Sequence, residues 1–406
     1  MTETPDVETR SAGMNATPAA ATRGRWRDRR LLLRLGGIVL IPPVLVIALV
    51  GGRGSAPATE GRTPAGSQTG SPRVDPGSRG STKNLGVAAP NHRIYWGAYI
   101  DGTDTYRHLY GGGWGDAPWD ASTWTKFEAA AGKKVAIVHW AMNWPPWQRD
   151  FDYWLPTFDL VRRASAINAV EMGTRHVPLR DIANGRYDGP LATWMRQAAA
   201  WQHPFFLILD SEMNGTWKPY SIGRNGNTAR DFVRMWRRVH DIARREGATN
   251  ITWVWTVNID PTNQFTPYEQ LYPGESYVDW TGLNGFNGEG DASFSWLFST
   301  SYASLLQVAP TKPIVITETG SVEGGIGKAA WIRDAFSDQL PQNFPQIRAV
   351  LWFNWRIRSG GRWRDYEIES SRSAQLAFEG AIASPYYAGR GMYDSPPLLG
   401  KIEPLR

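Results

Sequence analysis

Short apolar runs alternate with longer polar or amphipathic segments along the chain from about residue 93 onward. Eight runs are apolar throughout rather than at every second position, which is typical of parallel strands buried on both faces. They occupy residues 94–100, 134–140, 167–172, 205–210, 251–257, 278–283, 313–318 and 347–353. Between them, ARDFVRMWRRVHDIARREG carries apolar side chains at helical spacing, and Gly247 ends it with a stop signal. The pattern predicts eight strands that alternate with helices.

This alternation predicts an α/β protein whose strands close into a (β/α)8 TIM barrel. A doubly wound open sheet is the competing arrangement. We favour the barrel because the eighth run follows the seventh without the signal of an antiparallel edge strand. Catalytic side chains of such barrels lie at the C-terminal ends of the strands, so the residues that end or follow the apolar runs are the candidates for function.

The barrel domain is expected to occupy residues 92–388, and the flanking segments differ from it in composition. Residues 1–30 are rich in Thr, Ala, Pro and Arg, which predicts a disordered cytoplasmic tail. Residues 31–52 are apolar, and the arginines before them indicate a transmembrane signal anchor or signal peptide with its N-terminal side inside the cell. Residues 53–91, rich in Gly, Ser, Pro and Thr, predict a flexible linker. Residues 389–406 form a C-terminal tail, either an extended strap or a loose end.

The apolar segment has two possible fates. Arg29 and Arg30, followed by three leucines, resemble a twin-arginine export signal, and the stretch Ala56-Pro57-Ala58 offers small residues for cleavage. We favour an uncleaved anchor, because proline between the two alanines is a poor cleavage context. The sequence then predicts a protein of the cell membrane whose barrel domain is extracellular, or a secreted protein if the signal is cleaved.

Composition narrows the classes of function. The formal charge of +6 could suggest nucleic acid, but six arginines cluster beside the apolar segment, where membrane topology explains them, so we expect no nucleic-acid partner. The chain has no cysteine, which excludes disulfides and thiolate chemistry. No second histidine stands at ligand spacing from His139, so we expect no metal and no other cofactor. We take the chain to act as a monomer.

The 21 tryptophans are the unusual feature of the composition. Flat indole rings stack on the C–H faces of sugar rings and tolerate a wet groove. Any single Trp is more often a core residue, and Trp253, Trp255 and Trp355 could equally pack the barrel. The count therefore suggests a carbohydrate ligand without naming the rings that would bind it.

Two glutamates stand at the ends of apolar runs. Glu212 lies in LILDSEMNGTW after the fourth run, and Glu318 lies in PIVITETGS at the end of the seventh. Two carboxylates that meet in one pocket are what glycoside hydrolysis requires, because one must protonate the leaving oxygen while the other attacks or stabilises the sugar cation. The pair predicts a polysaccharide or oligosaccharide substrate.

The sequence resembles glycoside hydrolase family 26, a family of retaining (β/α)8 glycosidases that contains many β-mannanases. The resemblance covers about residues 94–388 and is carried by SEMNGTW, RNGNTARDFVRMWRRVHDIARREGATNITWVWTVN, ITETGSVEGG and AVLWFNW, in family order. It implies Glu212 as general acid/base and Glu318 as nucleophile. It further implies that Trp217 and Trp352 form sugar-stacking walls. The same resemblance implies that His139, Trp140 and Asn214 lie near the cleft. Asn258 and Phe286, which end or follow other runs, complete the candidate substrate-binding residues.

The implied roles agree with electrostatics. An ionised Glu318 at about 5–5.5 Å disfavours a second charge, so Glu212 keeps its proton and can donate it to the departing sugar. Once Glu318 is esterified, its charge is gone, and Glu212 can lose the proton and later take one from the attacking water.

Three positions depart from the family pattern. Family members commonly carry a His immediately before the acid/base, where this chain has Ser211, and a Tyr that donates to the nucleophile, where this chain has Phe286. Asp210 could tune Glu212 or bind a sugar substituent. Loss of one such donor costs a few kcal/mol of transition-state stabilisation, so it slows an enzyme without ending its activity.

These observations support three functions. The first is a retaining endo-acting hydrolase of a β-linked polysaccharide, with β-1,4-mannan foremost. The second is a catalytically weak or inactive glycan-binding or assembly protein of the cell envelope. The third is a hydrolase that trims the cell's own exopolysaccharide, which a membrane tether would suit.

Overall fold

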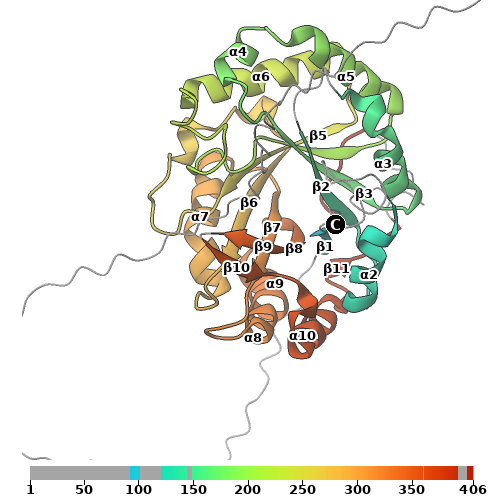
Figure 1. Cartoon of the computed structure of the whole chain (residues 1–406), viewed down its shortest axis with the longest axis vertical. Helices are drawn as coiled ribbons and strands as arrows, with labels where there is room; N and C mark the ends of the chain where they lie inside the picture. The colour runs from blue at the N-terminus through green and yellow to red at the C-terminus, as the bar shows by residue number, and fades with distance from the viewer. Residues whose placement is uncertain (1–91, 101–119, 144–148, 360, 392–399, 406) are drawn as a thin grey trace, which may run out of the picture. The chain divides into compact units, whose positions relative to one another are not determined.

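The computed structural model describes residues 92–100, 120–143, 149–359, 361–391 and 400–405. All eight predicted strands are present within them: β1 (Ile94–Ile100), β2 (Ile137–Asn143), β3 (Ile167–Gly173), β4 (Phe205–Leu209), β5 (Ile251–Asn258), β6 (Trp280–Asn287), β7 (Ile314–Ser321) and β8 (Ile347–Asn354). Each pairs in parallel with the next, and β8 pairs with β1 (Figure 1). The closed barrel confirms the predicted fold class and excludes the open sheet.

Helices follow the strands and form the outer layer (Figure 1). They are α2 (Ser122–Ala131), α3 (Phe151–Arg163), α4 (Leu179–Ala183), α5 (Asp188–Trp201), α6 (Ala229–Arg245), α7 (Phe294–Val308), α8 (Lys328–Ile332), α9 (Leu340–Asn343) and α10 (Arg372–Ile382), with a π-helix over Arg333–Gln339 and 3-10 turns at Tyr268–Gln270, Glu275–Tyr277 and Ile368–Ser370. The helix predicted from periodicity is α6. It begins at a capping box in which Thr228 and Asp231 satisfy each other's backbone N–H.

Side chains of each strand alternate between the barrel interior and the helix layer, as strand geometry requires. In β5, Val254 belongs to the interior cluster, whereas its neighbours Trp253 and Trp255 belong to the large cluster formed with the helices. Trp253 lies edge-on to Trp236 of α6. Trp253 and Trp255 are thus packing residues between barrel and helices, one of the two alternatives that the sequence left open.

The C-terminal tail packs under the barrel at the end where the strands begin. Ile402 is buried in the interior cluster, its N–H donates to Oγ1 of Thr252 at 2.8 Å, and its carbonyl accepts from Nε1 of Trp280 at 2.9 Å. Residues 400–405 therefore form a strap, as in the first of the two predicted alternatives. They close the end opposite to the one where catalytic side chains are expected.

Three smaller strands complete the fold. β11 (Tyr387–Ala388) pairs in parallel with the start of β1. β9 (Arg356–Ser359) and β10 (Arg362–Asp365) form an antiparallel hairpin directly after β8. Arg364 of this hairpin donates to the carbonyl of Gly288 just after β6, which fixes the hairpin at the C-terminal end of the barrel.

The predicted cytoplasmic tail, membrane segment and linker, residues 1–91, lie outside the described residues. Within the described part of the chain, none of the helices has both the length and the apolar character needed to cross a bilayer.

Candidate active site

Glu212 lies on a sharp turn that follows β4. The strand ends at Leu209, and both Asp210 and Glu212 have positive φ, 47° and 59°. This left-handed conformation costs a non-glycine residue roughly 1–2 kcal/mol. The N–H of Glu212 donates to the carbonyl of Thr256 on β5 at 3.1 Å, which holds the turn against the neighbouring strand. Such local strain is typical of functional sites, where the fold holds a side chain in one orientation.

The carboxyl group of Glu212 is buried and held through one oxygen. Its Oε2 accepts a 2.9 Å hydrogen bond from Nε1 of Trp217 and lies 3.4 Å from Nζ of Lys218. Oε1 is buried and has no hydrogen-bond partner among the described residues. One oxygen is thus oriented by the protein, and the other is available for a proton and a substrate oxygen.

Glu318 lies inside β7, three residues before the strand ends at Ser321. The pairing between β6 and β7 shifts register between Leu283 and Asn284, next to this position. Asn284 donates from Nδ2 to Oε2 of Glu318 at 3.3 Å. The carboxylate is only 3% exposed and therefore sits in the upper part of the barrel interior.

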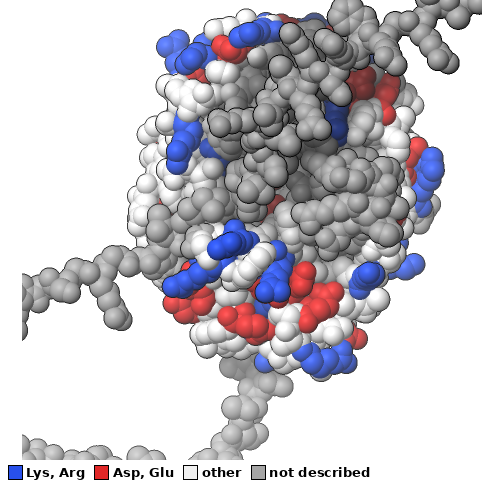
Figure 2. All heavy atoms as spheres, viewed as in Figure 1, with Lys and Arg blue, Asp and Glu red and all other residues white. Residues whose placement is uncertain are grey.

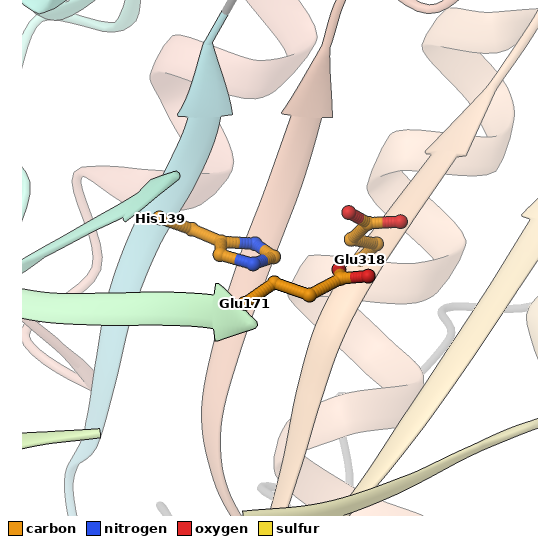
Figure 3. A group of neighbouring side chains, drawn as sticks. All are labelled: His139, Glu171 and Glu318. Atoms are coloured by element: carbon orange, nitrogen blue, oxygen red, sulfur yellow. The ribbon is translucent and has the colours of Figure 1, made fainter. Parts of the chain in front are cut away.

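His139, Glu171 and Glu318 point toward one another from β2, β3 and β7 (Figure 3). One ligand-type atom from each side chain lies within 4.8 Å of those of the other two. Nδ1 of His139 is 3.1 Å from the carbonyl of Thr317 and must donate to it, so Nδ1 carries a proton. Burial lowers the pKa of His139 to about 4, which leaves its ring neutral near pH 7.

Lys218 links the two predicted carboxylates and Glu171 into one cluster. Its Nζ lies 3.5 Å from Oε1 of Glu171 in addition to its contact with Glu212, and the charge of Glu318 also acts on it. Burial lowers the pKa of Lys218, but Glu171 and the surrounding groups outweigh burial and raise it well above its usual value. The ammonium stays charged, in contact with the carboxyl groups of Glu171 and Glu212.

The atoms of His139, Glu171 and Glu318 are of the kind that ligate a divalent cation. An ion there would stand beside the permanent positive charge of Lys218. It would also compete with the hydrogen bond of 2.7 Å that Ser211 donates to Glu171. The donor set therefore fits a pocket built around the ammonium of Lys218 better than a metal centre.

Residues 179–340 match the model of glycosyl hydrolase family 26. The chain carries a family 26 glycosyl hydrolase domain. Over 282 residues it is 31% identical to endoglucanase H of Acetivibrio thermocellus. The aligned region covers 67% of this chain and 30% of that protein. Over 154 residues it is 29% identical to a mannan endo-1,4-beta-mannosidase of Bacillus subtilis. That aligned region covers 36% of this chain and 38% of the mannosidase. The chain thus matches less than two fifths of the length of either relative.

A solved structure shares the fold of the family 26 domain. The catalytic domain of a GH26 endo-beta-1,4-mannanase from Bacillus sp. JAMB-750 matches with a TM-score of 0.54 at 17% identity, over 73% of this chain and 87% of that one. At that identity the likeness concerns the barrel and not the choice of sugar.

Trp217 and Asn214 lie where the sequence expects them, on the segment after β4. Trp217 is half-buried, with its ring edge-on to Phe265. Asn214 exchanges two hydrogen bonds with the backbone of Asn258, at 2.8 and 2.9 Å. The side chain of Asn258 donates to the carbonyl of Ile259. Trp217 thus keeps part of its surface exposed, while the two asparagines brace the turn that carries Glu212.

Trp140 and Trp352 are not brought to the site. Each occupies the strand position next to an interior residue, so each faces the helix layer. Trp140 packs against Trp154 and Phe158 of α3, and its Nε1 donates to Asn168. Trp352 is 1% exposed and packs among aromatic side chains of the outer layer, namely Trp331, Phe336 and Phe378. Neither ring has a face free for a sugar.

The three departures from the family pattern also have defined positions. Ser211 donates to Glu171 rather than to Glu212 or Glu318. Phe286 is buried in an aromatic cluster with Phe353 and Tyr366 and offers no donor.

Asp210 does not contact Glu212 and is closed to substrate. Its carboxylate is fully buried and accepts hydrogen bonds from the N–H and Oγ1 of Thr174, at 2.6 and 2.7 Å. Asp210 therefore ties the end of β4 to the segment after β3, and neither of the two roles considered for it from the sequence fits this position.

Sequence reasoning missed Glu171 and Lys218 and left Trp355 undecided. Each had a signal: Glu171 is a charge inside the apolar run INAVEM, and Lys218 is a charge within the aromatic stretch TWKPY. Trp355 is half-buried and stacks on Tyr99, whose ring in turn lies edge-on to His139. Trp355, directly after β8, is thus the tryptophan linked through Tyr99 to His139 of the site, whereas Trp352 is not.

Proposed function

We propose that the chain is a retaining, endo-acting hydrolase of a β-linked polysaccharide, with β-1,4-mannan as the first candidate substrate. The observation that carries this proposal is that the ammonium of Lys218 contacts Glu212 at 3.4 Å and Glu171 at 3.5 Å, and that Glu171 in turn lies within 4.8 Å of Glu318. Both predicted carboxylates therefore belong to one buried cluster. The family 26 domain supports hydrolysis of a glycosidic bond. The names of the relatives point to different glucan and mannan substrates, and the mannan choice rests on the resemblance of the motifs.

In the first step, Glu318 attacks the anomeric carbon while Glu212 gives its proton to the departing oxygen. The bond from the anomeric carbon to that oxygen breaks, and a glycosyl ester of Glu318 forms. In the second step water attacks the same carbon, its proton goes to Glu212, and the ester bond breaks with its electrons returning to Glu318. Oε1 of Glu212 suits this exchange because it has no other partner among the described residues.

Two tryptophans have a ring face available for sugar on this side of the barrel. Trp217 and Trp355 are both half-buried; Trp217 contacts Glu212 directly, and Trp355 stacks on Tyr99, whose ring lies edge-on to His139. The β9–β10 hairpin adds Trp363, which is 62% exposed. It borders a cleft of about 340 Å³ whose lining includes Val322, four residues after Glu318. We propose that these rings bind successive sugars of an extended chain, as stacking on C–H faces allows.

The decisive experiment is a panel of mannan, β-glucan and xylan substrates, assayed by release of reducing ends. We expect Glu318→Gln to lower activity by roughly 10⁴-fold or more, because the ester can no longer form. Glu212→Gln should fail on natural linkages but keep part of its activity on aryl glycosides, whose leaving groups need no proton. Retained activity of Glu318→Gln on any polysaccharide would contradict the mechanism. Product anomers followed by NMR test retention.

A glycan-binding protein with little catalysis is the second candidate. It is supported by Phe286, whose ring has no hydroxyl to donate, and by Ser211, which donates to Glu171. Calorimetry that shows oligosaccharide binding to the wild type, without any release of reducing ends over long incubation, would favour this candidate over the hydrolase.

The cellular location and the oligomeric state are also matters of proposal. We propose that residues 31–52 anchor a monomeric protein in the cell membrane with the barrel outside, where it meets polysaccharide. Fractionation of cells, with detection of the barrel by protease accessibility, tests this location.

A further inference from the structure

Lys218 is the most unusual group of the site, because a buried ammonium stands beside the proposed acid. Its side chain is 7% exposed, and its Nζ lies 3.4 Å from Oε2 of Glu212 and 3.5 Å from Oε1 of Glu171. A buried charge of this kind is costly unless it is paired, and removal of its partner leaves the cost uncompensated. The two glutamates together offset the cost of burying the ammonium in this position.

Glu171 is built to remain the charged partner of Lys218. Its Oε1 accepts from Ser211 at 2.7 Å and from the hydroxyl of Tyr220 at 3.4 Å. Burial alone would raise the pKa of Glu171, but Lys218, His139 and the bond from Ser211 lower it below the usual value. The negative charge therefore stays on Glu171, beside the ammonium.

The charge of the cluster changes with the reaction step. The titratable groups around Glu212 and Lys218 in the described structure are His139 of β2, Glu171 of β3, Asp210 and Tyr220 of the segment around Glu212, and Glu318 of β7. Before the reaction, the charge of Glu318 favours a protonated Glu212, against the pull of Lys218. After Glu318 becomes an ester, Lys218 acts without that opposition and favours the carboxylate that must accept the proton of water.

We propose that Lys218, held in place by Glu171, is a positioning residue that orients the carboxyl group of Glu212 and sets the balance between its acid and base forms. This inference rests on the proposed hydrolase function. It assigns to Glu171 and Lys218 a joint role in which two opposite charges act on Glu212. Removing either one should therefore shift the working pH range, and the two shifts should have opposite signs.

The test is the pH dependence of kcat/KM for Lys218→Met and Glu171→Gln, compared with the wild type. The alkaline limb of that profile reports loss of the acid's proton in the free enzyme. Loss of the ammonium should move the limb up by about one pH unit or more, because the proton on Glu212 becomes easier to keep. Loss of the Glu171 charge should move it down by a similar amount. A purely structural role would lower activity without opposite shifts.

Three controls accompany the two variants. Lys218→Arg keeps the charge and should keep the wild-type limb at reduced kcat. Lys312→Met removes a lysine that pairs with Glu275 at the other end of β7 and should leave the profile unchanged. Thermal unfolding checks that each variant is folded. If Lys218→Met does not fold, the shift of the alkaline limb in Glu171→Gln alone tests the proposal.

The outcomes separate the inference from the proposed function. A wild type that hydrolyses no glycan, or a Glu318→Gln variant with full activity, overturns the function itself. An active wild type that depends on Glu318, together with folded charge variants whose limbs do not move or move in the same direction, overturns the inference alone.

Discussion

The indole Nε1 of Trp217 donates a 2.9 Å hydrogen bond to Oε2 of Glu212. The ring reaches that position only because residue 215 is glycine: a Cβ at Gly215 would lie 2.3 Å from Cη2 of the indole. The segment SEMNGTW therefore works as a unit in which the turn, the glycine and the ring together orient one carboxylate oxygen.

We expect Trp217→Phe to lower kcat/KM by roughly 10- to 100-fold, which corresponds to the loss of one hydrogen bond to a charged group. The phenyl ring keeps an aromatic face, so KM should change less than kcat. Steady-state kinetics on a soluble oligosaccharide measures the split.

Gly215→Ala is the matched variant, since it leaves the indole in place but forces it away from its position. It should lower kcat in the same direction as Trp217→Phe. Full activity of Gly215→Ala would mean that the contact between the ring and Glu212 is not needed.

Trp352 and Trp355 stand three residues apart and should behave oppositely on substitution. Trp352→Ala empties a buried position among helix side chains, so it should lower the free energy of unfolding by about 3–5 kcal/mol. Trp355→Ala removes a half-buried ring and should mainly weaken oligosaccharide binding. Denaturant unfolding and calorimetry on both variants check the assignment, and a stable Trp352→Ala that has lost only binding would reverse it.

The fold could be predicted from the sequence because it depends on patterns that are local. Continuous apolar runs marked all eight strands, although β2 lies three residues further on than its run, and β6 and β7 end four and three residues beyond theirs. The shift matters in β7, where Glu318 stands inside the strand rather than at its end. A register shift between β6 and β7 beside this position is not visible in the sequence.

The site could be predicted only in part, because the face on which a strand residue lies depends on register. From the sequence alone, Trp352 and its neighbour Phe353 are equally plausible as residues that face the site. In the structure, Trp352 faces the helices and Phe353 faces the upper barrel interior. Contacts between distant segments were equally hidden: Lys218 and Glu171 stand 47 positions apart and meet only after β3 and β4 pair. Short motifs singled out Glu212 and Glu318 as candidates, and tertiary contacts were required to find the charges around them.

The exposed ring of Trp363 predicts that binding depends on the length of the substrate. Its indole lies 5.1 Å from the guanidinium of Arg356, in the Arg-rich hairpin where charged side chains gather (Figure 2). Trp363→Ala should weaken binding of long oligosaccharides several-fold and leave the shortest cleavable substrate unaffected, because only long chains reach the hairpin. Trp296→Ala, at an exposed tryptophan of α7, is the control. Equal loss for short and long chains would contradict this role.

The burial of Asp210 predicts how the free energy of unfolding changes with pH. Burial raises its pKa to about 7 from the usual 3.8, even though Thr174 donates two hydrogen bonds that lower it. Between about pH 4 and 7 the folded state therefore holds a proton that the unfolded state has lost. Because the folded state binds more protons in that window, the contribution of Asp210 to stability falls as pH rises through it and levels off above about 7.

Asp210→Asn removes this titration and keeps both contacts to Thr174, since the amide oxygen can accept from the N–H while the amide nitrogen donates to Oγ1. The free energy of unfolding of Asp210→Asn minus that of the wild type should therefore rise between pH 4 and 7 and stay constant above. Urea unfolding at several pH values measures the difference. Asp291→Asn, at an exposed position, should give a flat difference, and an equally flat one for Asp210→Asn would contradict the raised pKa.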